Sequence, residues 1–431
     1  MNIAVQAKRL IHRYIGEPTP KKNPKLLNRK DIVNIGSRAY TKAILYKGQS
    51  CLKKSFSTEH SGRVAFRNER LANKLFGKRG WFLQHKQTGI RSFVVERLSD
   101  EYRLDKAVQT MDLQQRKKAA AEVLSIILDL LVAGYCHRDI HGGNAFLIDG
   151  SIKLVDFETM TKYASEPPGL SNCYDISGVG ADSPWMTHQM CYTKKHSLAI
   201  GELLGISFEE AKMALSQLLI EELHQASLSF QTTNERGRHQ CALGAIYNTI
   251  DLPDLKVAPA MAQRDCAKRF RKFGISSESL GNKSVLDLGS NIGGIIFEAV
   301  KHSPLSAIGV EYDAAKVHVS NRVAKFSNLG TVRFIQADID KLKHSTIGGA
   351  KDVIFCLAVD GHVKKRNRLY KFLGTATKET LYFEGNSNSD IDLVREKLLA
   401  NGFRHVELLG MCDDDRRQEN NCRPLLRAFK A

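Results

Sequence analysis

The sequence has no long uninterrupted apolar run. Nowhere do its 431 residues reach the ~18 consecutive apolar positions of a membrane span, which argues against a transmembrane helix. Its N-terminus lacks the apolar core and small-residue cleavage site of a secretory signal. The nine cysteines are odd in number and scattered, with no C-x-x-C pair and no Cys/His cluster at metal-ligand spacing, which excludes a recognisable zinc site. We therefore expect a cytoplasmic protein with reduced thiols.

Positive charge is in excess, with a formal net charge of +18, and it predicts an anionic partner such as nucleic acid, a lipid surface or a phosphorylated glycan. The length is too great for one core and fits two domains. Residues 1–24 read as a basic amphipathic arm and a proline-containing linker, and such an arm could lie on an anionic membrane surface. A helix packed on the first domain with a solvated basic face explains the arm equally well.

The segment from His137 to Asn144 has the spacing H-R-D-x-x-x-x-N, and Asp156 follows in a D-F-x tripeptide. Phosphoryl transfer from ATP needs a carboxylate that orients the attacking hydroxyl. It also needs an amide and a second carboxylate that hold Mg²⁺ against the phosphates. The pattern therefore predicts Asp139 as the catalytic base, and Asn144 with Asp156 as the magnesium ligands. The residues between Asn144 and Asp156 predict two short strands around an Asp-Gly turn.

Segments typical of an ATP-binding lobe precede this motif. The turn expected over the phosphates, between two predicted strands, keeps only Gly36 of the usual three glycines. The next predicted strand has two adjacent lysines, of which Lys53 is expected to face the nucleotide, with Lys54 as the alternative. Glu69, on a predicted helix, is placed to pair with that lysine. By comparison with a kinase small lobe, Glu96 is expected on the strand beside the adenine.

This arrangement resembles the protein-kinase-like superfamily, and more narrowly its small-molecule and lipopolysaccharide kinases. His141 stands where protein kinases have a lysine, Glu158 replaces the Gly of D-F-G, and no A-P-E element follows. These departures imply a sugar or other small-molecule hydroxyl as the acceptor. The resemblance implies a bilobal α+β domain over residues 25–235 that uses ATP and Mg²⁺.

A second glycine-rich turn follows the apolar strand that contains Asp287. It holds Gly289 and Gly293, which allow a close approach of the backbone to a ligand. Two later predicted strands end in Glu311 and Asp338. A D-x-G-x-x-x-G turn with three acidic strand ends favours S-adenosylmethionine over NAD, whose binding fold uses G-x-G-x-x-G.

From residue 280 onward, seven predicted strands alternate with helices, except that the last two have no helix between them. This pattern resembles the class I (Rossmann-like, seven-stranded) methyltransferase fold, an α/β domain placed at residues 236–431. The resemblance implies that Asp287, Gly289 and Gly293 approach the methionine and ribose of the cofactor. It implies that Glu311 binds the ribose hydroxyls, and that Asp338 with Ile339 contacts the adenine. His362, after the fourth strand, is either a general base for a hydroxyl acceptor or a polar rim residue. The run Asp413–Asp415 is interpreted as part of a solvated, charged rim, with metal binding as the less favoured alternative.

A kinase-like domain followed by a methyltransferase domain resembles, in reversed order, the bifunctional kinase/methyltransferases that terminate bacterial O-antigen chains. The resemblance implies a glycan or glycolipid substrate that is phosphorylated and then methylated, with the new phosphate as one candidate methyl acceptor. The resemblance also implies a role in surface polysaccharide or lipopolysaccharide biosynthesis, with peripheral association at the cytoplasmic face of the inner membrane as an expectation. The alternative is a methyltransferase for RNA or another anionic substrate, whose kinase-like domain only binds or regulates. Nucleic acid is the less favoured partner because the complete set of kinase residues is present.

Overall fold

The computed structural model describes residues 32–35, 38–163, 169–174, 198–234, 237–241 and 243–430. The chain divides into two compact units, one ending at Leu215 and the other beginning at Ser216, whereas the sequence placed the domain boundary at residue 235. The expected basic arm at residues 1–24 and the expected phosphate-turn residue Gly36 lie outside the described residues. Within the described part of the chain, no helix is long and apolar enough to cross a membrane.

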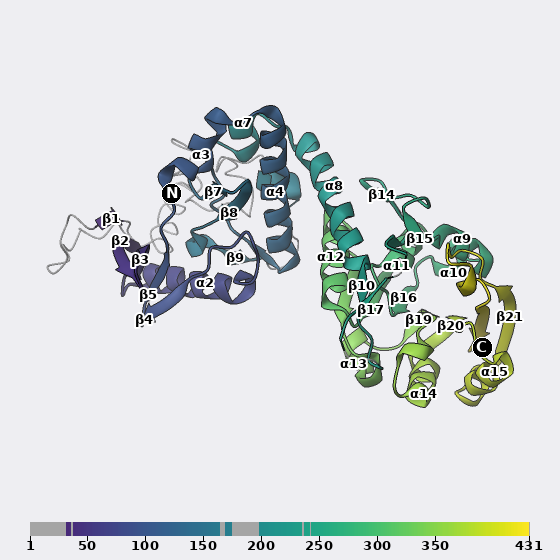
Figure 1. Cartoon of the computed structure of the whole chain (residues 1–431). Coiled ribbons are helices and arrows are strands. Elements are labelled where there is room, and N and C mark those ends of the chain that lie inside the picture. Colours follow the sequence, from purple (N-terminus) through teal and green to yellow (C-terminus); the bar gives the residue numbers. More distant parts are fainter. Residues whose placement is uncertain are drawn as a thin grey trace, which may run out of the picture. The chain divides into compact units, whose positions relative to one another are not determined.

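The first unit contains a five-stranded antiparallel sheet with the strand order β1-β2-β3-β5-β4 (Figure 1). Its strands are β1 (Ile32–Ile35), β2 (Ala39–Tyr46), β3 (Gln49–Phe56), β4 (Lys86–Gly89) and β5 (Ser92–Glu96). Helix α2 (His60–Phe76) packs on this sheet through a small apolar cluster that includes Phe56, Ala65 and Phe93. This contact sets which face of β3 is turned toward the helix.

The rest of the first unit is mostly helical and is built around α4 (Leu113–Val132), whose apolar side chains are almost all buried. A capping box between Asp112 and Gln115 fixes the start of α4. The hairpin β7 (Ala145–Ile148) to β8 (Ser151–Leu154) confirms the predicted strand pair. Its turn residues, Asp149 and Gly150, both have positive φ, as a tight two-residue hairpin turn requires. The other elements are η2 (Asp100–Tyr102), α3 (Leu104–Ala107), η3 (Val108–Thr110), β6 (Tyr135–Cys136), η4 (Phe157–Thr159), β9 (Thr161–Lys162), α5 (Leu170–Tyr174), α7 (Ile200–Leu204) and the first part of α8 (Phe208–Ser227).

The second unit contains a seven-stranded sheet with the order β18-β17-β16-β19-β20-β22-β21 (Figure 1). The first five strands in this order are parallel, and β22 is antiparallel to both of its neighbours. The strands are β16 (Ser284–Leu288), β17 (Ser306–Glu311), β18 (Val332–Gln336), β19 (Lys351–Leu357), β20 (Thr377–Glu384), β21 (His405–Met411) and β22 (Pro424–Phe429). This confirms the predicted seven-stranded α/β sheet, including the absence of an α-helix between the last two strands.

Helices cover both faces of this sheet, so its central strands are apolar on both sides. Residues of α13 (His344–Ile347), α14 (Arg366–Ala376) and α15 (Ile391–Ala400) form the main apolar core with one face. On the other face, α9 (Cys266–Phe273) stacks Phe270 on Phe355 of β19, and α11 (Gly294–Val300) packs beside it. Helix α12 (Ala314–Phe326) runs along β17 and β18.

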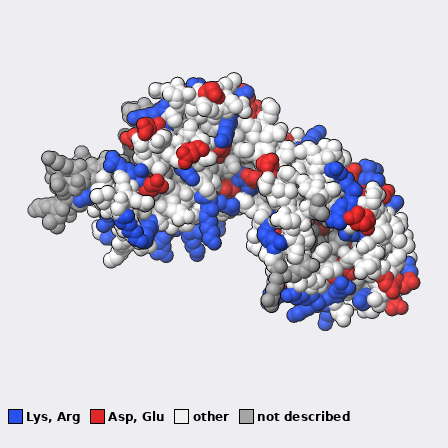
Figure 2. All heavy atoms as spheres, in the orientation of Figure 1, with Lys and Arg blue, Asp and Glu red and all other residues white. Residues whose placement is uncertain are grey.

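Short strands that the sequence did not predict lie before this sheet in the chain. They are β10 (Ser229–Phe230), β11 (His239–Gln240), β12 (Ile246–Asn248), β13 (Ile250–Leu252), β14 (Leu255–Val257) and β15 (Ala262–Arg264). The remaining short elements are α10 (Ser277–Leu280), η5 (Ile339–Lys341), η6 (Asp360–His362) and η7 (Gln418–Asn420). On the face shown in Figure 2, Lys and Arg cover more of the surface than Asp and Glu, in agreement with the net charge of +18.

Candidate functional site

The turn after β16 brings the backbone close to two other parts of the second unit. The N–H groups of Gly289 and Ser290 both donate to the carbonyl oxygen of Val310, at 2.8 and 3.0 Å. Gly289 has φ +75°, and a Cβ atom there would lie 2.6 Å from Cγ2 of Val359. Only glycine fits this position without strain, because both its backbone conformation and its surroundings exclude a side chain.

Glu311, at the end of β17, is held by three backbone N–H groups. Its Oε2 accepts from Asn291 N at 2.9 Å, and its Oε1 accepts from Tyr312 N at 2.7 Å and Asp313 N at 2.8 Å. A carboxylate offers about four acceptor positions, so roughly one is left for a ligand. These three hydrogen bonds fix the orientation of the Glu311 carboxylate before a ligand binds. They therefore also fix the direction of its remaining acceptor position.

Asp287, at the end of β16, is almost completely buried, with 2% of its surface exposed. Burial raises the pKa of its carboxyl to about 8, and the negative charge of Glu311 contributes to the rise. At neutral pH the carboxyl of Asp287 is therefore mostly protonated.

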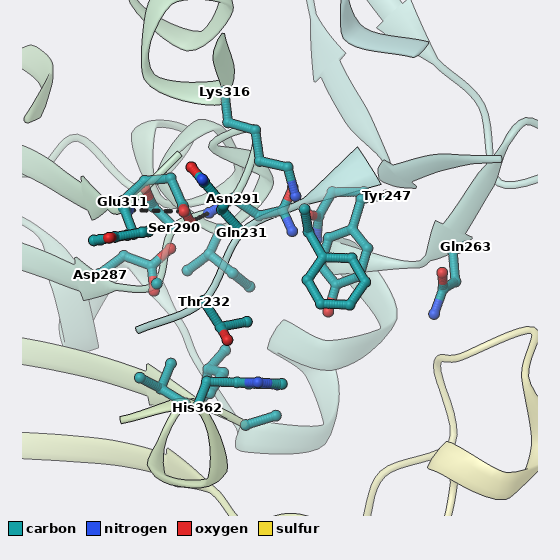
Figure 3. Close-up of a pocket in the computed structure, with 18 of the residues that line it drawn as sticks. Gln231, Thr232, Tyr247, Gln263, Asp287, Ser290, Asn291, Glu311, Lys316 and His362 are labelled. Carbon is teal, nitrogen blue, oxygen red and sulfur yellow. Dashed lines mark hydrogen bonds between the residues drawn. The ribbon is translucent and has the colours of Figure 1, made fainter. Parts of the chain in front are cut away.

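These side chains line a cavity of about 400 Å³ at the carboxyl ends of the parallel strands (Figure 3). In doubly wound sheets ligands bind at this edge. The cavity brings together five of the residues predicted from sequence: Asp287, Gly289, Glu311, Ile339 and His362.

Gly293 and Asp338, two predicted cofactor residues, do not line this cavity in the described structure. The Oδ1 atom of Asp338 accepts from Asp340 N at 2.9 Å and so caps the short helix η5. A Cβ atom on Gly293 would lie 2.5 Å from the ring of Phe334, so this glycine is needed for packing. We therefore assign both residues to the support of the site.

Another part of the cavity lining comes from η6 and from residues 230–234, which carry no recognisable motif. Thr233 Oγ1 and Asn234 Nδ2 donate to the carbonyl oxygens of His362 and Gly361, both at 2.8 Å. Sequence reasoning missed this segment and the strands that follow it. The lining residues that it missed there are Phe230, Gln231, Thr232, Thr233, Gln240, Cys241 and Tyr247. Their polar and aromatic side chains follow no spacing in the sequence that is typical of a binding motif. Ser290 and Asn291, in contrast, were marked by the glycine-rich turn.

A buried ionic cluster stands behind the cavity, and it corrects the expectation of a solvated Asp run. Arg264 contacts Glu384 at 3.0 Å, Asp414 at 3.0 Å and Asp415 at 3.2 Å. The side chains of these three acids are at most 1% exposed. Only Asp413 of the run lies at the surface. The run folds inward because Arg264, on β15, supplies the charge that such burial requires.

The first unit contains a second group of charged residues, around Lys54. The Nζ atom of Lys54 lies 2.7 Å from Glu69, 2.8 Å from Asp156 and 2.8 Å from Glu158. The expectation that Lys53 faces these acids is wrong. Successive side chains of a strand point to opposite faces, and it is the Lys54 face of β3 that is turned toward α2.

Electrostatics support the grouping around Lys54. Although burial lowers the pKa of Lys54, the three carboxylates raise it well above its ordinary value. Burial opposes ionisation of Asp156, yet Lys54 holds the pKa of that carboxyl below its ordinary value. Oxygen atoms of Glu69, Asp156 and Glu158 lie close enough together to hold a metal ion. Lys54 therefore neutralises part of a site that carries three carboxyl groups.

The predicted base Asp139 lies beside the predicted magnesium ligand Asn144. Asn144 Nδ2 donates to the carbonyl oxygen of Asp139 at 3.0 Å and to its Oδ2 at 3.3 Å. Burial, with help from Asp156, raises the pKa of Asp139 to about 6. Glu96 is exposed at the end of β5, next to Cys51 of β3.

No family model and no curated protein matches the chain. Solved structures similar to it include the N-terminal domain of EvdMO1 in the presence of SAH and D-fucose, with a TM-score of 0.34 and 17% identity over 42% of this chain and 90% of that one. The [4+2]-cyclase SpnF has a TM-score of 0.30 and 15% identity over 38% and 80% of the two chains. An S-adenosylmethionine-dependent methyltransferase from Mesorhizobium loti has a TM-score of 0.28 and 16% identity over 38% and 95%. Likeness at this level carries no conclusion about function, which we argue from the geometry of the two units.

Proposed function

We propose that the second unit is an S-adenosylmethionine-dependent methyltransferase. The observation that carries the proposal is the cavity at the carboxyl ends of the strands, where backbone N–H groups hold Glu311 with acceptor capacity left for a ribose hydroxyl. Asp287, Gly289 and Ile339 line the same cavity, as expected for the methionine and adenine parts of that cofactor. S-adenosylmethionine supplies an electrophilic methyl group, and the residues of the chain bind it and orient the acceptor.

Calorimetry with S-adenosylhomocysteine on the full chain tests this proposal. Glu311→Gln keeps the shape of the side chain but removes its charge, so affinity should fall by about 1.5–3 kcal/mol, the range for a hydrogen bond to a charged group. Glu396→Gln, an exposed acid on α15, is the matched control and should leave the affinity unchanged. Tight binding of NADH, with none of S-adenosylhomocysteine, would overturn the proposal.

We infer a second activity, ATP-dependent phosphoryl transfer, for the first unit. The supporting observation is the contact of Lys54 with Glu69 and Asp156, next to an Asp139–Asn144 pair of the predicted kind. Lys54 would bind the nucleotide phosphates, Asp156 and Asn144 would hold Mg²⁺, and Asp139 would orient the acceptor hydroxyl. The Mg²⁺ dependence of ATP binding tests this activity. Asp156→Ala should abolish that dependence, and a wild-type protein that shows no thermal shift with Mg²⁺ and ATP would refute it.

We further propose that both units act on one substrate, a glycan or glycolipid, and that the new phosphate is the methyl acceptor. Its oxygen attacks the methyl carbon, the carbon–sulfur bond breaks and neutral S-adenosylhomocysteine leaves. A phosphate oxygen is already anionic near neutral pH, so this reaction needs no strong base. Asp139→Ala should therefore abolish methylation of unphosphorylated acceptor but spare that of pre-phosphorylated acceptor. His362→Ala should reduce the rate less than about tenfold, below the ~10²-fold effect of a general base.

The positive charge favours one alternative, in which the methyltransferase acts on RNA and the first unit only binds or regulates. Co-purification of nucleic acid that is lost at high salt, together with methylation that Asp139→Ala leaves unchanged, would favour this alternative. Association with the cytoplasmic face of the inner membrane through residues 1–24 also stays a proposal. Flotation with anionic lipid vesicles tests it, with a chain lacking residues 1–24 as the control.

A further inference from the structure

One end of the methyltransferase cavity is rich in hydrogen-bond donors. Figure 3 places Tyr247 and Gln263 on the side opposite Asp287 and Glu311. The cavity is also lined by Arg269, Arg417, Asn420 and Arg423. Gln263, Arg417 and Asn420 all donate to Asp415, and Arg423 donates to Asn420, so these residues lie near Gln263. Burial raises the pKa of the Tyr247 phenol, so this group stays a protonated donor at neutral pH. Three guanidinium groups are more than the single carboxylate of the cofactor requires, because one arginine can bind a carboxylate through two parallel hydrogen bonds.

The acids that compensate these arginines stand behind them. Arg269 contacts Asp414 at 2.9 Å, and Arg423 lies 3.5 Å from Glu384. Neither acid is among the described residues that line the cavity, and their side chains are at most 1% exposed. The acids thus orient the guanidinium groups of Arg269 and Arg423 from outside the cavity lining. Buried acids that position arginines in this way pre-organise a site, because the side chains need not be ordered when a ligand binds.

Two of these arginines also have buried N–H groups that lack a protein partner. The Nε atoms of Arg269 and Arg423 are buried and make no hydrogen bond within the described structure. Arg269 is only 4% exposed. An unsatisfied buried donor of a charged group is unfavourable, so it calls for an acceptor from outside the chain.

We propose that this end of the cavity binds an anionic group of the methyl acceptor, a phosphate or a carboxylate, through Arg269 and Arg423 with the phenol of Tyr247. The proposal rests on the methyltransferase function proposed above and names the chemistry of its acceptor. A phosphate group, with several oxygen atoms, can accept from both guanidinium groups at once. A neutral sugar hydroxyl would offer these donors only an uncharged acceptor, which makes the weaker hydrogen bond.

Binding of inorganic phosphate and of acetate to the full chain, saturated with S-adenosylhomocysteine, tests the proposal by calorimetry. Arg423→Gln should weaken phosphate binding by about tenfold or more, the order expected when a charged hydrogen bond is lost. Tyr247→Phe, which keeps the ring, should weaken it about threefold. Arg395→Gln, at a partly exposed arginine on α15, removes the same charge and should have no effect. A larger loss for phosphate than for acetate identifies the phosphate as the acceptor group, and the reverse identifies a carboxylate.

The affinity for S-adenosylhomocysteine distinguishes a failure of the anion-site proposal from a failure of the methyltransferase proposal. It should stay within about twofold in Arg423→Gln and Tyr247→Phe, which also shows that the second unit is folded. If Arg423→Gln weakens S-adenosylhomocysteine tenfold and spares 5′-methylthioadenosine, the arginines hold the carboxylate of the cofactor and the proposal is wrong. Equal losses of phosphate binding in Arg423→Gln and Arg395→Gln would overturn it as non-specific attraction. If wild-type protein binds no S-adenosylhomocysteine, the methyltransferase proposal fails, independently of the phosphate result.

Discussion

Asp287 should make the preference for S-adenosylmethionine over S-adenosylhomocysteine depend on pH. Burial and the neighbouring Glu311 raise the pKa of this carboxyl from 3.8 to about 8, so the unliganded protein holds it protonated near pH 7. A sulfonium ion favours the carboxylate form. Binding of S-adenosylmethionine should therefore release a proton from Asp287, whereas the uncharged thioether should release none.

The magnitude follows from Coulomb's law. Two unit charges roughly 6 Å apart attract each other by about 3 kcal/mol at an effective dielectric constant of ~20, which is about two decades in affinity. The ratio of the two affinities should thus rise by up to about 100-fold between pH 6 and pH 9. Both ligands have the same amino and carboxylate groups, so the titration of these groups cancels in the ratio.

The same pKa has a consequence for stability. At Asp287 the folded protein binds more protons than the unfolded chain between pH 4 and pH 8, because the folded pKa of this carboxyl is the higher one. Its contribution to stability is present below about pH 4 and is lost as pH rises toward 8. The loss is on the order of 5 kcal/mol at 1.36 kcal/mol per pKa unit. Asp287→Asn should therefore stabilise the unliganded protein at pH 8.

Calorimetry at several pH values, in two buffers that differ in ionisation enthalpy, measures both the affinities and the number of protons released. Asp287→Asn should make the ratio of affinities independent of pH and abolish the extra proton. A ratio that is constant with pH in the wild-type protein would refute the reasoning. An equal pH dependence in Asp287→Asn would assign the effect to another group.

Four further predictions concern other contacts. If the first unit transfers phosphate as proposed, Lys54→Met should lower the rate by about two decades or more, as expected when a charge that positions the phosphates is lost. Lys53→Met should change the rate less than about threefold. If Asp139 is the base, kcat/KM for phosphorylation should rise with pH through about 6 and then level off, because burial raises its pKa to about 6 and only the carboxylate accepts a proton. Arg264→Met should lower the free energy of unfolding, measured with urea, by about 3–5 kcal/mol, since it leaves three buried acids without their main partner. Gly289→Ala should abolish binding of S-adenosylhomocysteine, because its Cβ would meet Val359 at 2.6 Å, whereas Gly330→Ala, with open space around it, should not affect binding.

The sequence by itself determined the seven strands of the large sheet in the second unit, the hairpin after Asn144 and the identity of most acids. The strands of the second unit are apolar runs bounded by turns and helices, and this local pattern is sufficient to place them. Glycine at position 289 and the acids at the ends of β16 and β17 stand at fixed short spacings, so they could be found before the fold was known. The same holds for Asp139, Asn144 and Asp156, whose spacing is set by one loop and one hairpin.

Tertiary structure alone decided which of two equivalent residues is used and which charges are buried. Alternation shows that Lys53 and Lys54 face opposite ways, but the packing of α2 on β3 selects Lys54. The Asp run looked solvated because its partner Arg264 lies 150 residues away from Asp414 in the chain. The donor-rich end of the cavity has the same origin, since β15, α9 and the loop before β22 meet only in the folded protein. The use of Lys54, the burial of the Asp run and the donor-rich end of the cavity all depend on contacts between distant segments. Such contacts produce no periodicity or fixed spacing in a single sequence, so the sequence could not predict them.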